Sequence, residues 1–174
     1  TGEFNKLELD LGGKSVLARS VESMLAYCSK VYVVVGHYRD SLARLLGELH
    51  NVEIVFNPCY ENGMFSSVKA GLANIKAPRF FFMPGDCPCV TADVFKQMLL
   101  IDRPIVVPRY RNQPGHPVLM HSTLIPQILQ GPYRSLREFI NDQGCVFAEV
   151  DCPGILIDID TMEDYQRILS QFYH

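Results

Sequence analysis

One segment decides the fold class: Arg79-Phe80-Phe81-Phe82-Met83-Pro84-Gly85-Asp86-Cys87-Pro88. Its continuous apolar run is typical of a strand that is buried on both faces, as in a parallel sheet. Pro84 and Gly85 end the strand, so Asp86 is expected on a stiff turn at the strand's carboxyl end. A carboxylate there can bind a hard cation such as Mg²⁺. An Asx turn, in which Asp86 bonds only its own backbone, is the alternative.

Short apolar runs alternate with helical patterns on both sides of this segment. Apolar residues at helical spacing, such as Leu17, Val21 and Met24, predict helices, and β-branched runs such as Val31–Val35 predict buried strands. We expect helices at 17–27, 40–49, 64–75, 91–100, 122–129, 135–141 and 162–172, and strands at 31–35, 52–56, 80–83, 105–107, 118–120, 146–150 and 155–159. The alternation predicts one domain over residues 1–174, a Rossmann-like three-layer α/β/α fold with a mostly parallel sheet.

The composition is that of an ordinary globular domain. Of the 174 residues, 48% are hydrophobic and 20% are charged, which excludes a disordered chain, a collagen-like fibre and a coiled coil. The net charge of −3 includes no basic excess, so no nucleic-acid partner is expected. No apolar run approaches the ~20 residues of a membrane span, and no signal peptide opens the chain. With six cysteines and no such signal, we expect reduced thiols and a cytoplasmic protein without a membrane partner.

A second source of carboxylates lies near the C-terminus, in Leu156-Ile157-Asp158-Ile159-Asp160-Thr161. Residues two apart share one face of a strand, so Asp158 and Asp160 are expected to point the same way. The alternative is that Asp160 or Thr161 caps the last helix and that Asp158 is solvated. That alternative accounts well for one of the two carboxylates, but less well for the presence of both.

Two further segments carry groups that suit an anionic ligand. A glycine and the hydroxyls of Ser66 and Ser67 lie at the start of the expected helix 64–75, where free N–H groups favour polar or anionic ligands. An ordinary serine cap is the alternative. Lys6 follows a loop-like stretch and could reach phosphates as a point charge, although in isolation it reads as an exposed lysine.

A loop with two arginines and one histidine follows the strand 105–107. The guanidinium groups of Arg109 and Arg111 can bind phosphate or carboxylate through paired hydrogen bonds. His116 lies between Gly115 and Pro117, which restrict the backbone and favour a fixed side chain. A lone histidine in a loop is more often a surface residue than a catalytic one.

Six segments in order along the chain resemble the MobA-like nucleotidyltransferase family, most closely its molybdenum cofactor cytidylyltransferase branch. They match the end of the opening motif (1–6, with Thr1 for Met and one extra residue before Lys6), L-G-G-K-x-V-L (11–17), N-x₅-G-M-x-x-S-x₃-G-L (57–72), G-D-x-P (85–88), G-H-P (115–117) and D-I-D-T-P-E-D (158–164, with Met162 for Pro).

This resemblance implies a nucleotide-diphospho-sugar transferase type of fold and a Mg²⁺-dependent enzyme. It would move CMP from CTP to a phosphorylated acceptor, a pterin cofactor, and release pyrophosphate. By resemblance, the nucleotide would contact Gly2, Lys6, Ser67, Gly85 and Asp86, with Lys6 and Asp86 catalytic; the metal would bind Asp86 with Asp158 or Asp160; and the acceptor would face Arg109, Arg111 and His116.

Some alternatives to this function stay within the nucleotidyltransferase family, and one assigns the chain to a different class of protein. Within the family, GTP could replace CTP, or a sugar phosphate could be the acceptor. Outside it, the chain could be a nucleotide-binding regulatory module without turnover. The resemblance also leads us to expect that about ten upstream residues, carrying the family's first strand and glycine-rich loop, precede Thr1 in the natural protein.

Overall fold

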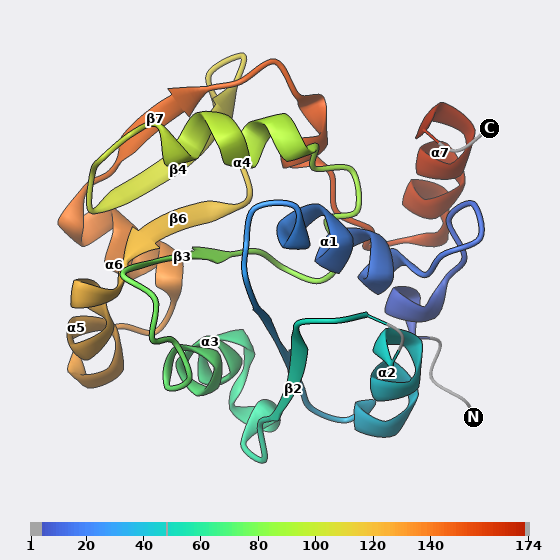
Figure 1. Ribbon diagram of the computed structural model, residues 1–174, viewed down its shortest axis with the longest axis horizontal. Helices are drawn as coiled ribbons and strands as arrows, with labels where there is room; N and C mark the ends of the chain where they lie inside the picture. The colour runs from blue at the N-terminus through green and yellow to red at the C-terminus, as the bar shows by residue number, and fades with distance from the viewer. Residues whose placement is uncertain (1–4, 48, 173–174) are drawn as a thin grey trace.

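The computed structural model describes residues 5–47 and 49–172, and Figure 1 shows their α/β arrangement. The helices are α1 (Val16–Leu25), α2 (Arg39–Leu46), α3 (Met64–Leu72), α4 (Ala92–Leu99), α5 (Ile125–Gln130), α6 (Leu136–Gln143) and α7 (Met162–Phe172). The strands are β1 (Val31–Val35), β2 (Val52–Phe56), β3 (Arg79–Phe82), β4 (Ile105–Tyr110), β5 (Gln113–Pro114), β6 (Val118–His121) and β7 (Val146–Glu149). Short 3₁₀ helices are η1 (Lys6–Glu8), η2 (Tyr60–Asn62), η3 (Ser122–Leu124) and η4 (Pro153–Leu156). The expected helices are confirmed, with ends that differ by a few residues.

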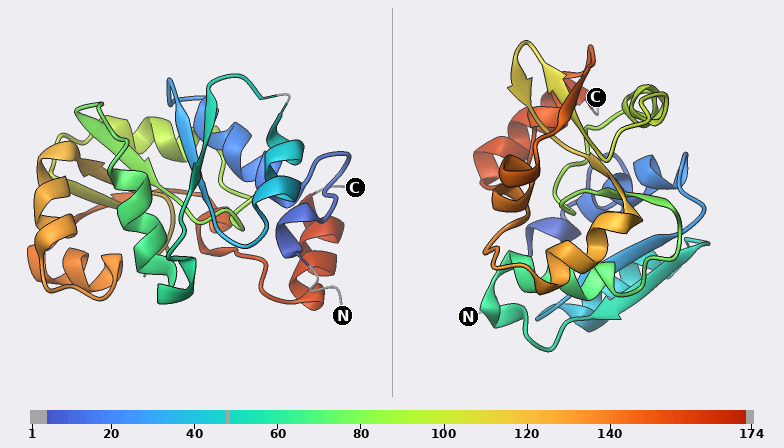
Figure 2. Two further views of the ribbon diagram at one scale, coloured as in Figure 1. Left: turned by 90° about the horizontal axis from the view of Figure 1, so that it is seen from below. Right: turned by 90° about the vertical axis from the view of Figure 1, so that its left-hand side faces the viewer.

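Within each sheet of the described residues, most strands run in the same direction. β6 is antiparallel to both β3 and β4, so these two are parallel to each other, and β7 pairs parallel with β4. β1 and β2 form a separate parallel pair. The reversed strands are β6 and the short β5, which forms a hairpin with the end of β4 and projects from the body in Figure 1 and in the right panel of Figure 2. The mostly parallel sheet is therefore confirmed.

Helices cover both faces of the larger sheet. Phe81 and Val106 pack on one face with Phe95 of α4, and the rings of Phe81 and Phe95 meet edge to face at 5.0 Å. Their sequence neighbours Phe80 and Ile105 point to the other face and pack with residues of α3, α5 and α6. Because successive strand residues alternate between faces, this division confirms three layers.

A cleft of about 930 Å³ lies between β1 and β3. Consecutive residues of each strand line it, 31–34 on one side and 79–82 on the other. Since consecutive side chains point to opposite faces, the edges of the two strands face each other across the cleft. Within the described residues, β1 pairs only with β2, and β3 only with β6. An upstream strand in this cleft could pair with β1 on one side and with β3 on the other. The existence of such a strand stays a prediction.

Helices α1 and α3 lie on opposite sides of this cleft. Each of them packs against residues on both edges of the cleft. Met24 of α1 packs both with the cluster around β1 and with the cluster around α4. Leu72 of α3 packs with Phe80 of β3. On the same helix, Gly71 lies so close to β1 that an added Cβ would be 3.0 Å from Val34 Cγ2. The cleft therefore has helical walls above and below its two strand edges.

The strand expected at 155–159 is wrong. Residues 153–156 form η4, and residues 157–160 continue outside any strand. Gly154 explains the turn, because its backbone packs so tightly on Cys89 that an added Cβ would lie 1.9 Å from the Cys89 carbonyl oxygen. Ile155 and Ile159 are nevertheless only 2% and 1% exposed. The apolar pattern there indicated burial rather than a strand.

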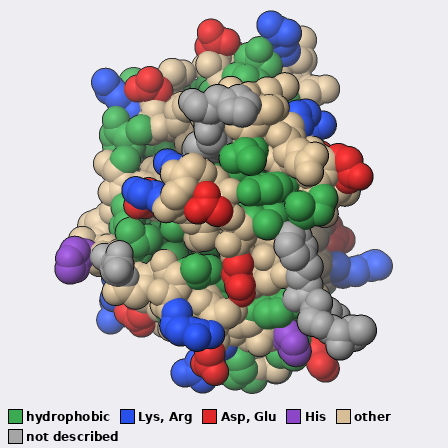
Figure 3. Space-filling view, turned by 90° about the vertical axis from the view of Figure 1, so that its right-hand side faces the viewer, with side chains coloured by type: hydrophobic (Ala, Val, Ile, Leu, Met, Phe, Trp, Pro, Cys, Tyr) green, Lys and Arg blue, Asp and Glu red, His purple; other side chains and the backbone are tan. Residues whose placement is uncertain are grey.

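The two ends of the described chain pack against each other. Leu11 and Val16 lie in one cluster with Ile159 and Ile168 of the C-terminal part. Tyr165 Oη donates a hydrogen bond to the Asp10 carbonyl oxygen at 2.6 Å. Figure 1 shows α7 beside the N-terminal segment. Figure 3 views the molecule from that side and shows positive and negative side chains interspersed on this face.

In the part of the chain that the structure describes, every helix is too short or too polar to cross a membrane.

Candidate functional site

Lys6 is the centre of a charged cluster at one end of the cleft. Its Nζ lies 2.8 Å from Asp86 Oδ2 and 2.7 Å from Asp160 Oδ1. Asn5 fixes the start of η1 by accepting a hydrogen bond from the backbone N–H of Leu7. Burial alone would lower the pKa of Lys6, but the hydrogen bonds and charges of Asp160 and Asp86 outweigh it and raise the pKa. Lys6 therefore stays charged, and the structure brings three of the predicted site residues together.

Asp86 is held by the turn that follows β3. Its carbonyl oxygen accepts a hydrogen bond from Ile159 N at 3.1 Å, which ties this turn to the segment that carries Asp160. Gly85 lies close to α1, where an added Cβ would be 3.0 Å from Leu17 Cδ1. The side chain of Asp86 is only 19% exposed. The Pro-Gly-Asp turn thus points a nearly buried carboxylate at Lys6.

His116 is the neutral member of the site. Its backbone N–H donates to the Ile155 carbonyl oxygen at 2.9 Å, and its ring meets Phe82 edge on at 6.1 Å. Burial lowers the pKa of His116, while the charges of Asp86 and Asp158 act in the opposite direction and do not compensate. Nδ1 is buried without a hydrogen-bond partner among the described residues. The imidazole is therefore uncharged at neutral pH and has a free polar atom.

Asp158 and Asp160 do not act as the same-face pair that a strand would have made of them. Asp160 pairs with Lys6, whereas Asp158 acts electrostatically on His116 and Cys87, as Asp86 does. Their segment lies outside any strand, so the strand rule that led to this expectation does not apply. Asp158 and Asp160 therefore have different surroundings.

Arg109 and Arg111 lie on the β4–β5 hairpin and make their contacts there. Arg109 Nε donates to Glu149 Oε1 at 2.7 Å, and its guanidinium lies over the Phe147 ring. Arg111 has a φ of 48° and places its guanidinium 5.1 Å from the Tyr110 ring. The described structure brings neither arginine into contact with Lys6, Asp86 or His116, so their role toward an acceptor stays a prediction.

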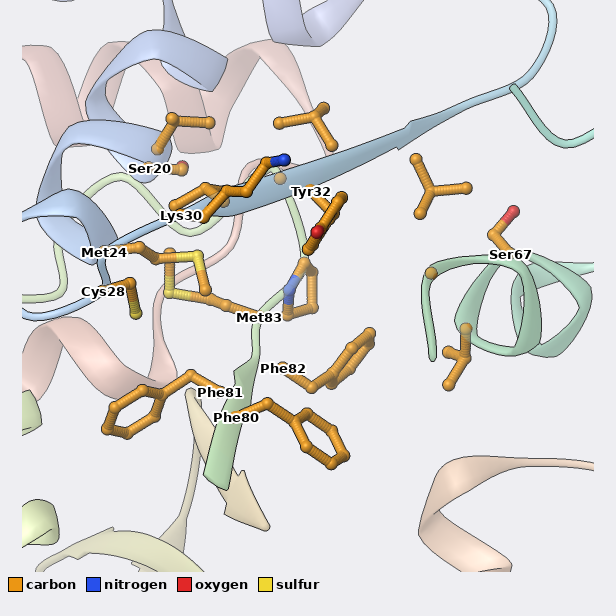
Figure 4. A pocket seen from close by; sticks show the side chains of 18 of the residues that line it. Ser20, Met24, Cys28, Lys30, Tyr32, Ser67, Phe80, Phe81, Phe82 and Met83 are labelled. Carbon is orange, nitrogen blue, oxygen red and sulfur yellow. The ribbon is translucent and has the colours of Figure 1, made fainter. Parts of the chain in front are cut away.

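The walls of the cleft are mainly apolar, as Figure 4 shows for the phenylalanine rings of β3 and the sulfur-bearing side chains of Met24, Cys28 and Met83. Such walls offer no partners to phosphate groups. Polar and charged side chains also line the cleft, among them Lys30, Lys76 and Arg79 as well as Lys6, Asp86 and Ser67. The phosphates of a nucleotide are therefore expected beside Lys6 and Asp86, and not between the facing edges of β1 and β3.

The carboxylates suit a hard divalent cation. Asp86 and Asp160 already share one positive group, the Lys6 ammonium, and oxygen donors are the ligands that Mg²⁺ prefers. Within residues 5–47 and 49–172, no three His, Cys, Asp or Glu side chains converge on a common metal position. Mg²⁺ is commonly held by one or two carboxylates together with substrate phosphates, so two protein ligands are sufficient.

Two residues complete the comparison with the sequence expectations. Gly2, expected at the nucleotide, lies outside the described residues. Asn57, which is 3% exposed, donates hydrogen bonds to Ser66 and Ser67 and was not singled out as a site residue. Its signal was a polar residue directly after the strand 52–56, at the end where open α/β sheets bind ligands.

Comparisons with known proteins show the family of the chain. The family model described as "MobA-like NTP transferase domain" matches residues 1–150. The molybdenum cofactor cytidylyltransferase of Escherichia coli (strain K12) is 28% identical over 153 residues, which are 87% of this chain and 80% of that protein.

Solved structures of similar fold cover nearly the whole chain. A homologue of the Mycobacterium tuberculosis protein Rv0371c, from Mycobacterium sp. strain JC1, is 25% identical with a TM-score of 0.79, over 96% of this chain and 87% of that chain. A nucleotidyl transferase from Methanothermobacter is 20% identical with a TM-score of 0.84, over 97% and 85% of the two chains. The chain therefore belongs to the family of MobA-like NTP transferase domains and is a nucleotidyltransferase.

Proposed function

We propose that the protein transfers CMP from CTP to a phosphorylated pterin, in molybdenum cofactor biosynthesis, and releases pyrophosphate. The observation that carries nucleotidyl transfer is the convergence of the Lys6 ammonium on the carboxylates of Asp86 and Asp160 at the polar end of the cleft. The choice of CTP and of a pterin acceptor is supported by the similarity to the Escherichia coli enzyme.

The chemistry requires positioning and charge neutralisation more than proton transfer. An oxygen of the acceptor phosphate attacks the α-phosphorus of CTP, the bond to the β-phosphate oxygen breaks, and its electron pair leaves with pyrophosphate. The attacking phosphate is already ionised at neutral pH, so no general base is needed. Lys6, kept charged by its two carboxylates, can turn toward the arriving phosphates and neutralise the charge that develops on them.

Mg²⁺ is the divalent metal that we propose for the reaction. Asp86 would hold it together with Asp158 or Asp160, and the ion would neutralise phosphate charge and align the two phosphates. Asp86 is the fixed member of either pair. It is less exposed than Asp158 and Asp160, and its carbonyl oxygen accepts a hydrogen bond from the Ile159 N–H.

His116 is the residue that we expect to contact the acceptor. It faces the charges of Asp86 and Asp158, and its Nδ1 has no partner among the described residues. A neutral imidazole can hydrogen-bond an acceptor group without adding charge. Arg109 would have to exchange Glu149 for the acceptor phosphate, and Arg111 would have to leave its contact with Tyr110.

Pyrophosphate release tests this proposal. We expect release from CTP in the presence of Mg²⁺ and a molybdopterin-type acceptor, and little from GTP, ATP or UTP. Release from GTP alone would instead assign guanylyl transfer, and release only with a sugar phosphate would assign a different acceptor. Nucleotide binding without release under every condition would contradict the proposal.

The Asp86→Asn variant tests the site itself. The amide keeps the size of the side chain but removes the negative charge that faces Lys6, so we expect the rate to fall by about 10²-fold or more. Asp102→Asn is the matched control, because Asp102 is 90% exposed and its ion pair among the described residues is with His121. Circular dichroism checks that both variants fold. An Asp86→Asn enzyme as active as the control would refute the role of Asp86.

A further inference from the structure

The backbone holds two carboxylates of the site next to each other. Asp86 lies in the turn after β3, and its carbonyl oxygen accepts a hydrogen bond from Ile159 N at 3.1 Å. Ile159 is 1% exposed, so the core fixes this contact, and Asp160 follows directly after it. Two like charges held at close range repel each other and favour a cation between them.

The Lys6 ammonium is the cation between these two carboxylates. Its Nζ lies 2.8 Å from Asp86 Oδ2 and 2.7 Å from Asp160 Oδ1. Both oxygens therefore converge on one positive atom, as the carboxylate ligands of a divalent ion do. Lys6 thus occupies the place that a metal ion shared by Asp86 and Asp160 would take.

Lys6 can leave this place through its side chain alone. Its backbone is fixed, because Asn5 Oδ1 accepts a hydrogen bond from Leu7 N at 3.2 Å and Leu7 packs with two apolar clusters. The side chain is 34% exposed and ends in a point charge on a flexible stem. The ammonium can therefore move to phosphate oxygens while the backbone stays where it is.

The ammonium and a divalent ion exclude each other between these carboxylates. An ammonium has no lone pair to offer a metal, and two positive charges a few ångströms apart repel strongly in a partly buried site. The phosphates of a nucleotide change this balance, because they attract the ammonium and supply further oxygen ligands to the metal. Binding of a metal and binding of a nucleotide are therefore coupled through Lys6.

We propose that Lys6 is a stand-in cation, which keeps a divalent metal from Asp86 and Asp160 until a nucleoside triphosphate draws its ammonium away. The metal then binds with the nucleotide or after it, and not before it. This inference rests on the proposed function, because it requires a metal between these carboxylates. It gives Lys6 control over the order in which the ligands bind, and it selects Asp160 as the second metal ligand.

Binding of Mn²⁺ to the nucleotide-free protein tests this role without any turnover. Electron paramagnetic resonance measures the free Mn²⁺ in a titration. Lys6→Met keeps the length of the side chain and removes its charge, so we expect this variant to bind Mn²⁺ at least about tenfold more tightly than the parent. Adding Asp160→Asn to Lys6→Met should abolish the gain. No gain in Lys6→Met, or a gain that survives Asp160→Asn, would overturn the inference.

Lys14→Met is the matched control. Lys14 is also paired with a carboxylate, since its Nζ lies 2.7 and 2.8 Å from the two oxygens of Glu22. The control removes the same charge from the same N-terminal segment, and it should bind Mn²⁺ as the parent does. An equal gain in both variants would contradict the inference, because it would show an effect of net charge.

Two further substitutions keep the test decisive. Lys6→Arg retains the positive charge and should exclude Mn²⁺ as the parent does; if it bound Mn²⁺ as Lys6→Met does, the charge would not be the cause. If circular dichroism shows that Lys6→Met does not fold, Lys6→Gln replaces it. The glutamine amide is uncharged but can still donate a hydrogen bond to a carboxylate, so the same gain in Mn²⁺ affinity is expected.

A non-hydrolysable CTP analogue with a methylene bridge between the α- and β-phosphorus separates this inference from the proposed function. The analogue should raise the affinity of the parent for Mn²⁺, and by a larger factor than in Lys6→Met, where no ammonium has to be displaced. Equal factors in the two proteins would overturn the inference and leave the proposed function standing. A parent protein that binds neither the analogue nor Mn²⁺ in its presence would instead contradict the proposed function.

Discussion

At the scale of the residue, Gly115 shows how tightly the backbone next to His116 is packed. An added Cβ would lie 2.2 Å from the Ile155 carbonyl oxygen, the same atom that accepts the His116 N–H. Gly115→Ala should therefore push η4 away from the 115–117 segment and weaken that hydrogen bond. We expect a loss of about 1–3 kcal/mol in the free energy of unfolding, measured by urea denaturation.

Gly47→Ala is the control for this substitution. Gly47 is exposed with a φ of −61°, and an added Cβ would meet its nearest backbone atoms at 3.5 and 3.6 Å, which is ordinary contact. The alanine should leave the free energy of unfolding unchanged or raise it slightly. If Gly115→Ala were as stable as Gly47→Ala, the close approach to Ile155 would be wrong.

At the scale of the element, α7 begins with a reciprocal cap. Thr161 Oγ1 accepts from Asp164 N at 3.1 Å, and the Asp164 carboxylate accepts from Thr161 N at 3.0 Å. The sequence offers Asp160 and Thr161 as possible caps, and the structure shows that Thr161 is the one. Thr91 stands at the same place before α4, yet its side chain makes no capping hydrogen bond there.

The cap predicts a pH dependence of stability. The hydrogen bonds from the Thr161 side chain and backbone lower the pKa of Asp164 below its usual value, with Arg167 adding to the shift. Because the folded-state pKa is the lower one, the stabilisation is fully present above the unfolded pKa, near 3.8, and is lost as pH falls through the folded value. Asp164→Asn should lower the unfolding midpoint by a few degrees at pH 7, and by less as the pH is reduced below 3.8.

Glu163→Gln is the matched control for this prediction. It removes the same charge from the same helical turn, but Glu163 takes no part in the reciprocal cap. Thermal unfolding of the two variants across the pH series compares them directly. The same midpoint for both variants at pH 7 would show that helix electrostatics, rather than the cap, stabilises the start of α7.

Local patterns predicted the elements well and their partners poorly. The strand 80–83 and the turn at Asp86 were readable because burial, Pro and Gly are all local signals. Residues 155–159 misled because a β-branched apolar run indicates burial, and the tight contact of Gly154 with Cys89 depends on distant chain. The pairing of Arg109 with Glu149 required the β4–β7 register, which lies in no single segment.

At the scale of the whole molecule, the cleft between β1 and β3 predicts how a longer natural chain would behave. An upstream strand lying there would hydrogen-bond to both facing edges and join the β1–β2 pair to the larger sheet. Amide hydrogen exchange in β1 and β3 should then be slower in a protein extended upstream by such a strand than in the 174-residue chain, and the unfolding temperature should rise. Identical exchange in both proteins would contradict this placement.

The contact between Lys6 and Asp160 also has a consequence for the time at which the site forms. The two residues are 154 positions apart, so a ribosome adding about 5–20 residues per second makes Lys6 roughly 8–30 s before its partner exists. By then β1 to β7 have all been synthesised, but Asp160 and α7 are still to come. A nascent chain can therefore have made all of these strands while the proposed site of Lys6, Asp86 and Asp160 still lacks Asp160.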